Sequence, residues 1–178
     1  MKNKEPNCPN EFTVDFGKKL VAYLGGDPAP IQDDWCWMKF AMEYPELVKP
    51  AEDYFATATT GDPAHAAYLM VENCDSSRKW AEGVITAATI GDPAWAAYLM
   101  VLNCSSNRKW AESMIVAATT GDPAHAAYLM VCNCGSRKKW AESVITVATT
   151  GNPVWIASLM MQNCGSSLEW VEKVKLAH

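Results

Sequence analysis

The sequence predicts an all-α protein, an α-solenoid of five two-helix repeats preceded by an N-terminal capping helix. One phrase carries most of this prediction: TGDPAHAAYLMVENC begins at Thr60 and returns, with small changes, from Ile90, Thr120 and Thr150. The spacing is 30 residues each time, and a fixed period of this size is typical of repeat architectures. Each unit holds two helix-length segments separated by turn residues, so the repeat is expected to be a helical hairpin.

The GDP segment of each repeat predicts where its first helix begins. Gly61 suits the left-handed conformation that follows a helix end, and Asp62 can cap the next helix. Pro63 fits the first turn of that helix, where its missing N–H would have had no partner anyway. The first helix is therefore expected from Pro63 to about Asn73. A phosphate-binding loop is the alternative for GDP, but such a loop needs several glycines and usually a lysine.

The second helix of each repeat is predicted to have one wet face. Residues CDSS turn the chain after the first helix, Ser76 is the expected cap, and the helix should cover about residues 77–89. Helical spacing separates charged residues from an apolar side made of Trp80, Ala81, Val84, Ile85, Ala87 and Ala88. Core packing is therefore expected of the tryptophan column Trp80, Trp110, Trp140 and Trp170.

The array is predicted to fill residues 31–178, after an arm and capping helix in residues 1–30. Its repeats are expected at 31–60, 61–90, 91–120, 121–150 and 151–178. A single hairpin of this size cannot bury enough surface to offset its conformational entropy, so the units must stack and share a core. In the first repeat Pro50 replaces the tryptophan, so its second helix should start near Pro50 and be short. In the last repeat Lys175 replaces an isoleucine, which suits the polar end of an array.

The recurring blocks GDPA(H/W)AAYLMV and RKWAES(V/M)I resemble the short two-helix repeats of the α-solenoid class, HEAT-like in size and layout, over about residues 31–178. The blocks match no HEAT, TPR, ankyrin or pentatricopeptide sequence pattern. The resemblance implies a right-handed stack and a bias toward binding. It implies no reaction, because a fold alone does not specify chemistry.

The first helices are apolar almost all round and leave only a narrow exposed stripe. Its leading column is Trp35, His65, Trp95, His125 and Trp155, and its second column is Met42, Glu72, Leu102, Cys132 and Gln162. The tyrosines beside them are Tyr68, Tyr98 and Tyr128. The second column changes in every repeat while the core columns hardly change, which suits a shared aromatic floor with residue-specific contacts. Rows of exposed aromatic residues mark interfaces; the alternative is that the tryptophans pack between adjacent helices.

Two further columns have structural explanations. Stacking should separate Cys74, Cys104, Cys134 and Cys164 by about 10 Å, too far for a disulfide or a shared metal ion. We expect these cysteines, four of seven in the chain, to be buried, reduced thiols. The column Asn73, Asn103, Asn133 and Asn163 is expected to bond backbone groups in the turns between repeats and so to fix their register.

Composition and motifs favour a non-enzymatic binding protein. The net charge of −5 argues against nucleic acid as partner. The three histidines include His65 and His125, which stand two repeats apart. Because no catalytic or phosphate-loop motif occurs, we expect no catalytic residue, metal site or cofactor. No apolar run of about 18 residues and no secretory segment occurs, so no membrane association is expected and the cytoplasm is the expected location.

The main functional hypothesis is therefore a protein-protein interaction module. It would bind a protein or peptide through a concave, aromatic-lined face anchored by Trp95 and Trp155, as an adaptor or as an inhibitor of a larger enzyme. One alternative is a single-stranded nucleic-acid reader whose rings stack on bases. Another is a self-assembling protein whose face pairs with its own copy in a homodimer.

Overall fold

The computed structural model describes residues 42, 45 and 48–178, and α-helices are the main secondary structure of this part of the chain. The helices are α3 (Val48–Phe55), α4 (Pro63–Asn73), α5 (Arg78–Ala87), α6 (Pro93–Cys104), α7 (Arg108–Ala117), α8 (Pro123–Cys134), α9 (Lys138–Val147), α10 (Pro153–Cys164) and α11 (Leu168–Ala177). No strand occurs in these residues. The predicted arm and capping helix, residues 1–30, and the first helix of the first repeat with Trp35 lie outside them.

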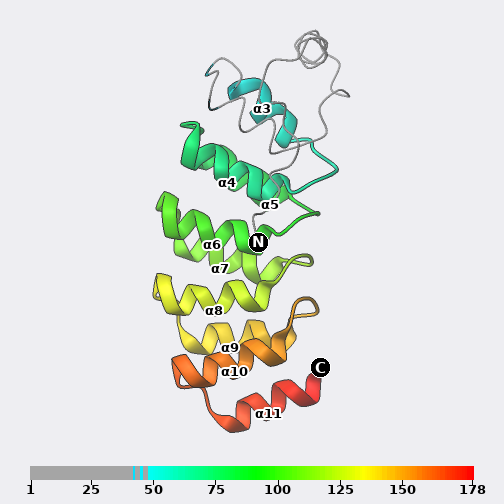
Figure 1. Cartoon of the computed structure of the whole chain (residues 1–178), viewed down its shortest axis with the longest axis vertical. Helices are drawn as coiled ribbons and strands as arrows, with labels where there is room; N and C mark the ends of the chain where they lie inside the picture. The colour runs from blue at the N-terminus through cyan, green and yellow to red at the C-terminus, as the bar shows by residue number, and fades with distance from the viewer. Residues whose placement is uncertain (1–41, 43–44, 46–47) are drawn as a thin grey trace, which may run out of the picture.

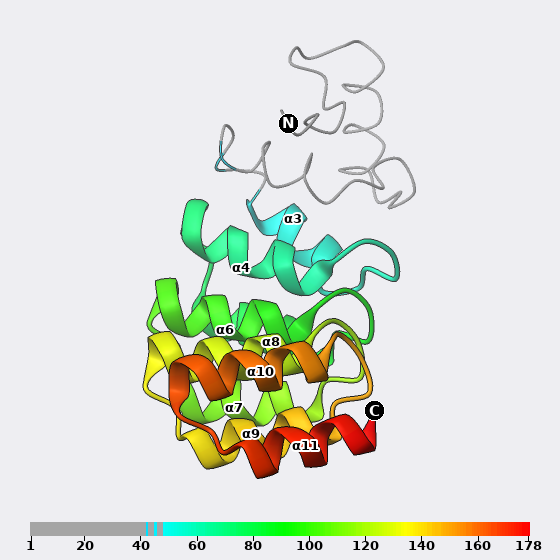
Figure 2. The same ribbon diagram turned by 60° about the horizontal axis from the view of Figure 1, so that its bottom comes forward.

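Helices α4 to α11 form hairpins that stack on one another in chain order (Figure 1). The first helices α4, α6, α8 and α10 make one layer, and the second helices α5, α7, α9 and α11 make the other (Figure 2). Each first helix packs directly on the first helix of the next hairpin, whereas the second helices approach one another less closely. The chain is thus a helical repeat protein, as its period predicts.

The GDP segments both start the first helices and join successive repeats. Gly61 has a φ of +76° and Pro63 is the first residue of α4, as predicted. The predicted cap is confirmed too, because Asp62 Oδ1 accepts a hydrogen bond from the backbone N–H of His65 at 3.0 Å. The other oxygen, Oδ2, accepts a bond from the backbone N–H of Asp92 in the next repeat at 3.2 Å, and the same bond recurs one repeat later.

The second helices start one residue later than predicted. Ser77 caps α5, because its Oγ accepts a hydrogen bond from the backbone N–H of Trp80 at 3.4 Å. Ser76 instead donates its backbone N–H to the carbonyl of Met70 at 3.3 Å and closes the end of α4. The prediction of Ser76 as cap is wrong because two adjacent serines offer the same local chemistry. Helix α5 also ends earlier than predicted, at Ala87, which is exposed rather than buried.

The core lies between the two layers and runs through the whole stack. Its largest fully buried side chains include Met70, Ile85, Met100, Ile115, Met130, Ile145 and Met160. The tryptophans of the second helices lie only half-buried at the edge of this core. The indole N–H of Trp110 donates to Thr86 Oγ1 of the preceding repeat at 3.3 Å, so this ring stays where it can satisfy its polar group. The core prediction for this column therefore holds only in part.

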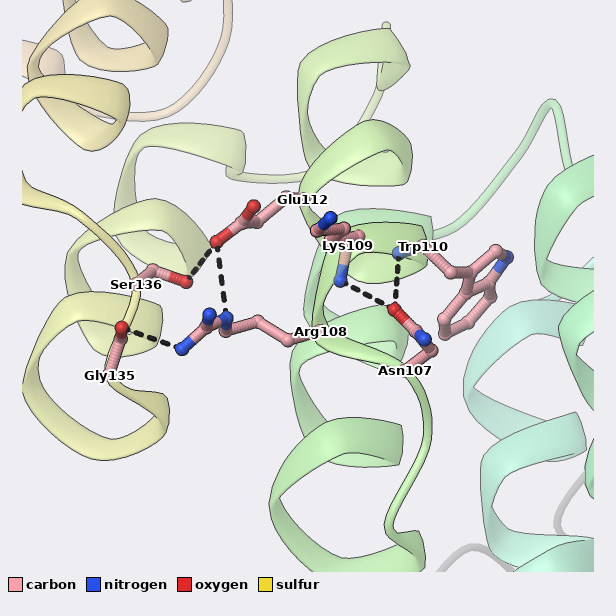
Figure 3. Close-up of polar contacts among 7 residues, drawn as sticks. All are labelled: Asn107, Arg108, Lys109, Trp110, Glu112, Gly135 and Ser136. Carbon is pink, nitrogen blue, oxygen red and sulfur yellow. Dashed lines mark hydrogen bonds and ion pairs between the residues drawn. The ribbon is translucent and has the colours of Figure 1, made fainter.

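A hydrogen-bonded clamp joins the start of each of the second helices α5, α7 and α9 to the C-terminus of the first helix in the next hairpin. Figure 3 shows it for α7: the guanidinium of Arg108 donates to the carbonyl of Gly135, just past the C-terminus of α8, at 2.8 Å. Glu112 pairs with Arg108 at 3.7 Å, four residues before it on the same helix, and accepts a hydrogen bond from Ser136 at 2.7 Å. A cation at a helix C-terminus also complements the helix dipole, so the clamp stabilises α8. Lys138 makes the equivalent bond one repeat later.

Helix α3 lies where the sequence predicts a short second helix for the repeat at 31–60. It has only 8 residues, fewer than α5, α7, α9 and α11, and it begins two residues before Pro50. Phe55 of α3 is buried where this helix packs on α4. Among the described residues, no helix combines the length and the apolar character that a bilayer span requires.

Candidate binding surface on the first helices

A row of aromatic rings runs along the layer of first helices, at the third residue of each. We call His65, Trp95, His125 and Trp155 the ring row. The N-cap side chain of each helix accepts a hydrogen bond from the backbone N–H of its ring-row residue, at 2.9 to 3.0 Å in all four helices. The capping residue thus fixes the backbone from which each ring projects, which places the rings in register from one repeat to the next.

The last three rings of the row, Trp95, His125 and Trp155, contact one another across the repeats. The ring centroids of Trp95 and His125 are 5.8 Å apart, and those of His125 and Trp155 are 6.2 Å apart. Trp155 is 52% exposed, whereas the other three rings are half-buried. The tryptophans therefore neither stand free nor pack completely between helices. They form a continuous aromatic surface over α6, α8 and α10.

The second predicted column is exposed wherever the structure describes it. Met42 is 50% exposed and Leu102 is 46% exposed. Glu72, Cys132 and Gln162 are exposed as well. Each of the first helices α4, α6, α8 and α10 therefore presents a different second-column side chain beside an aromatic ring: an acid, an aliphatic group, a thiol and an amide. This is the arrangement that the sequence predicts.

The tyrosines do not belong to this exposed face in the way the sequence predicts. Tyr68 and Tyr98 are buried, with 4% of each residue exposed, and Tyr128 is half-buried. The prediction that Tyr68 and Tyr98 lie on the exposed face is wrong, because their rings are buried beside the ring row. The Trp95 and Tyr98 centroids, for example, are 5.3 Å apart. Tyr68 and Tyr98 therefore pack against His65 and Trp95 on the side of these rings that faces the core.

A column of leucines takes the place that the tyrosines were expected to fill. Leu69, Leu99, Leu129 and Leu159 are half-buried and pack against the edge of the core. The sequence predicts first helices that are apolar almost all round and does not place Leu69 on their exposed stripe. Yet Leu69 lies four residues after His65 and three before Glu72, which is the spacing of one helical face. That spacing is the signal that could have placed the leucines on the surface.

The asparagine column forms the predicted ladder between repeats, but with different partners. Asn103, Asn133 and Asn163 donate their side-chain amides to the tyrosine hydroxyls of the preceding repeat, at 2.7, 2.8 and 2.9 Å. The predicted bonds to backbone groups of the turns are not what these side chains make. Asn73 does bond a backbone group, the carbonyl of Leu69 within its own helix, at 2.9 Å. The ladder still links each repeat to the next, as a register device would.

Charge is concentrated at one end of the face. Tyr68 donates its hydroxyl to Glu72 Oε2 at 2.5 Å and accepts from Asn103 at 2.7 Å. Burial of the phenol, followed by its bond to Glu72, raises the pKa of Tyr68 to about 12. Tyr68 therefore stays neutral and holds the carboxylate of Glu72 at the surface. The corresponding positions on α6, α8 and α10 are held by Leu102, Cys132 and Gln162, so no carboxylate recurs there.

The cysteine column is less buried than predicted. Cys74, Cys104, Cys134 and Cys164 are all half-buried. Burial is nevertheless the main cause that raises the pKa of each of these thiols above its ordinary value. In the described part of the chain, no group of three or more His, Cys, Asp or Glu side chains is placed to hold a metal ion. What the face offers chemically is stacking, apolar contact and hydrogen bonding, with a negative charge at Glu72.

Breaking one rung of the ladder should weaken the coupling between repeats. We expect Asn133→Ala to lower the free energy of unfolding by about 1 kcal/mol, because a neutral hydrogen bond contributes roughly that much. Tyr98→Phe removes the same bond from the other side and should cost about the same. In a double-mutant cycle followed by urea unfolding, the second substitution should then add little to the first. Strict additivity would show that Asn133 and Tyr98 do not interact.

Comparisons of this chain with protein-family models, with curated proteins and with solved structures gave no match. The interpretation of the surface therefore follows from its own geometry.

Proposed function

We propose that this chain is a non-enzymatic protein-interaction module, a right-handed stack of five helical hairpins whose first-helix face binds a peptide segment of another protein. The observation that carries the proposal is the unbroken set of ring contacts from Trp95 through His125 to Trp155, with Trp155 half exposed. Aromatic side chains at the centre of a contact surface dominate binding energies. Because backbone caps and neighbouring rings already hold these side chains, little further side-chain entropy is lost on binding.

The spacing of the helices supports a concave shape for this face. The first helices approach one another more closely than the second helices do. A stack with one tighter layer bends toward that layer, and such curvature creates the extended concave surfaces that repeat proteins use for binding. A peptide lying along the stack would cross one repeat after another and meet a different second-column side chain on each.

The chemistry of the face favours an apolar or aromatic peptide segment. Trp95, Trp155 and Leu102 offer apolar contacts over α6 to α10. The exposed carboxylate of Glu72 lies toward one end, where it favours a cationic side chain of the partner. An adaptor and an inhibitor of a larger enzyme would both use such a face, and the cytoplasm remains the expected location.

The positive charges of the stack do not support nucleic acid as the partner. Most basic residues of the described part of the chain lie at the start of α5, α7 and α9, about 14 Å from the ring row along the first helices. Several of them are already used as clamps: Arg78, Arg108 and Lys138 donate to backbone carbonyls of the following repeat. Binding of single-stranded nucleic acid and pairing with a second copy of the chain are therefore the two alternatives that the experiment below must distinguish from peptide binding.

Selection of peptides from a random display library on the intact chain tests the proposal. Peptides that bind the wild type should lose roughly thirtyfold or more in affinity for the Trp95→Ala, Trp155→Ala double variant, because truncating a hot-spot residue costs about 2 kcal/mol or more. Affinity would be measured by isothermal titration calorimetry, with circular dichroism showing that the variant keeps its helices.

A matched control removes exposed apolar groups from the other layer. Val116 and Val147 are 61% and 71% exposed and line a groove of about 260 Å³ on the second helices. The Val116→Ala, Val147→Ala double variant should bind the selected peptides as the wild type does. If it loses affinity while the tryptophan variant does not, the partner binds the second-helix layer and the proposal is wrong. Salt-dependent binding of short single-stranded oligonucleotides, or concentration-dependent mass in light scattering that the tryptophan variant abolishes, would favour the alternatives instead.

A further inference from the structure

Two thiols from different columns meet between α8 and α10. Cys132 Sγ lies 3.7 Å from Cys164 Sγ, in van der Waals contact. The sequence columns did not reveal this pair, because Cys132 belongs to the second column and Cys164 to the cysteine column. Equivalent positions are 30 residues apart, whereas these two are separated by 32. The pair exists because side chains near the ends of adjacent first helices meet with a small stagger.

Only one of the described first helices supplies the exposed thiol of such a pair. On α4 the position of Cys132 is held by Glu72, and on α6 by Leu102. The same stagger brings Glu72 near Cys104, where its charge is one cause, after burial, of the raised pKa of that thiol. Side chains at these two positions therefore lie near each other in more than one pair of repeats. Among the described first helices, only α8 places an exposed cysteine beside the cysteine of the next first helix.

The two thiols differ in access to solvent. Cys132 is exposed, whereas Cys164 is half-buried. Burial, followed by the contact with Cys132, raises the pKa of Cys164 to about 11. An oxidant in solution therefore reaches Cys132 first, and Cys164 stands behind it as a protonated thiol. Closing the separation to a disulfide bond requires a shift of roughly 1.7 Å, which rotation of the two side chains can provide. Cys164 is the last residue of α10, where the backbone adjusts most easily.

We propose that Cys132 and Cys164 form a reversible disulfide between α8 and α10 when the chain meets a peroxide. The thiolate of Cys132 attacks one oxygen of hydrogen peroxide, the O–O bond breaks, and the released hydroxide takes a proton to become water. The sulfur of Cys164, losing its proton, then attacks the resulting sulfenic acid, and a second water leaves as the S–S bond forms. Two thiols are oxidised and one peroxide is reduced to two waters.

The disulfide would lie within the proposed binding face. Cys132 is one of its second-column residues, and Tyr128 of the same helix already bonds Asn163 of α10 at 2.9 Å. Oxidation would replace a contact between two thiols by a covalent bond and hold α8 against α10 beside the ring row. The proposal of the disulfide itself does not depend on the identity of any binding partner.

Peroxide treatment of the intact chain in dilute solution tests the proposal. After remaining thiols are alkylated, non-reducing tryptic mass spectrometry should find peptide 110–137 joined to peptide 140–173, and dithiothreitol should separate them. Because Cys132 and Cys134 share a tryptic peptide, variants identify the linked residue. Cys134→Ser should keep the link, whereas Cys132→Ser and Cys164→Ser should abolish it.

Three outcomes would overturn this assignment. They are a wild type that forms no Cys132–Cys164 link at peroxide levels that oxidise the Cys132 thiol to the sulfinic acid, a link that survives in Cys132→Ser, and a link formed between two chains instead of within one. Cys132 is exposed, so its serine variant is expected to fold normally. Circular dichroism before and after oxidation shows whether the compared variants keep the same helical content.

Discussion

Gly121→Ala should lower the free energy of unfolding by about 3 kcal/mol or more. Gly121 has a φ of +75°, where a β-carbon is unfavourable, and a β-carbon added there would lie 2.1 Å from Asp92 Oδ1. The Asp92 side chain cannot move away without losing its bonds, because it accepts from the backbone N–H groups of Trp95 at 2.9 Å and Asp122 at 3.1 Å. One methyl group would therefore disturb both a helix cap and a link between repeats.

Gly165→Ala provides the matched control. Gly165 has a φ of +69°, but an added β-carbon would meet no heavy atom within 4 Å. Only the backbone penalty of about 1 to 2 kcal/mol is then expected. Urea unfolding followed by circular dichroism compares Gly121→Ala and Gly165→Ala directly. Equal losses of unfolding free energy would show that the contact between the added β-carbon and the Asp92 side chain contributes nothing. They would also contradict a role of the Asp92 side chain in joining the repeats.

Met100→Ala should cost about 3 kcal/mol, because it opens a cavity in the shared core. Met100 is fully buried on α6, between the two layers of helices. Its loss is felt by both neighbouring hairpins, since α6 packs on α4 and on α8. We expect the urea midpoint of unfolding to fall clearly, while the variant keeps the helical circular dichroism signal of the wild type in the absence of denaturant.

Leu102→Ala on the same helix is the corresponding surface substitution. Leu102 is 46% exposed, so its truncation should change stability by less than about 1 kcal/mol. It should weaken peptide binding instead, if the first-helix face is the binding surface. Similar stability losses for Met100→Ala and Leu102→Ala would mean that α6 is oriented differently in the stack.

The bounds of the first helices could be predicted because local chemistry determines them. Glycine at positive φ, an aspartate cap and a proline in the first turn are properties of adjacent residues, and Pro63 begins α4 as expected. The same local reasoning failed between Ser76 and Ser77, where both residues can cap a helix. The choice depends on Ser76 being used to close α4, which only the turn geometry shows.

Contacts between repeats were harder to predict because neighbours in space are not equivalent in sequence. Comparing columns pairs each residue with the one 30 positions later, as the Asp62 and Asp92 bond does. Side chains that reach along the helix obey other separations: Tyr98 meets Asn133 at 35 positions. Column comparison therefore found the asparagine ladder but assigned it the wrong partners, and it missed the thiol pair entirely.

The aromatic row of the candidate site could be predicted, since helical spacing places one ring on the least apolar side of each first helix. The residues exposed beside that stripe could not be predicted, because they depend on how each helix is rotated about its axis against its neighbours. In the stack, Tyr98 is buried with its hydroxyl bonded to Asn133 of the next repeat, whereas Leu99 is half-buried at the edge of the core. Tertiary contacts decide such flanking positions, and the sequence of one repeat contains no record of them.

Oxidative footprinting of the tryptophans, with and without a bound selected peptide, tests the binding face most directly. Trp155, 52% exposed in the free chain, should be oxidised readily and become protected in the complex together with Trp95. The tryptophans of the second helices, such as Trp110, should react alike in both states. Protection of Trp110 with no change at Trp155 would place the partner on the opposite layer and contradict the proposed function.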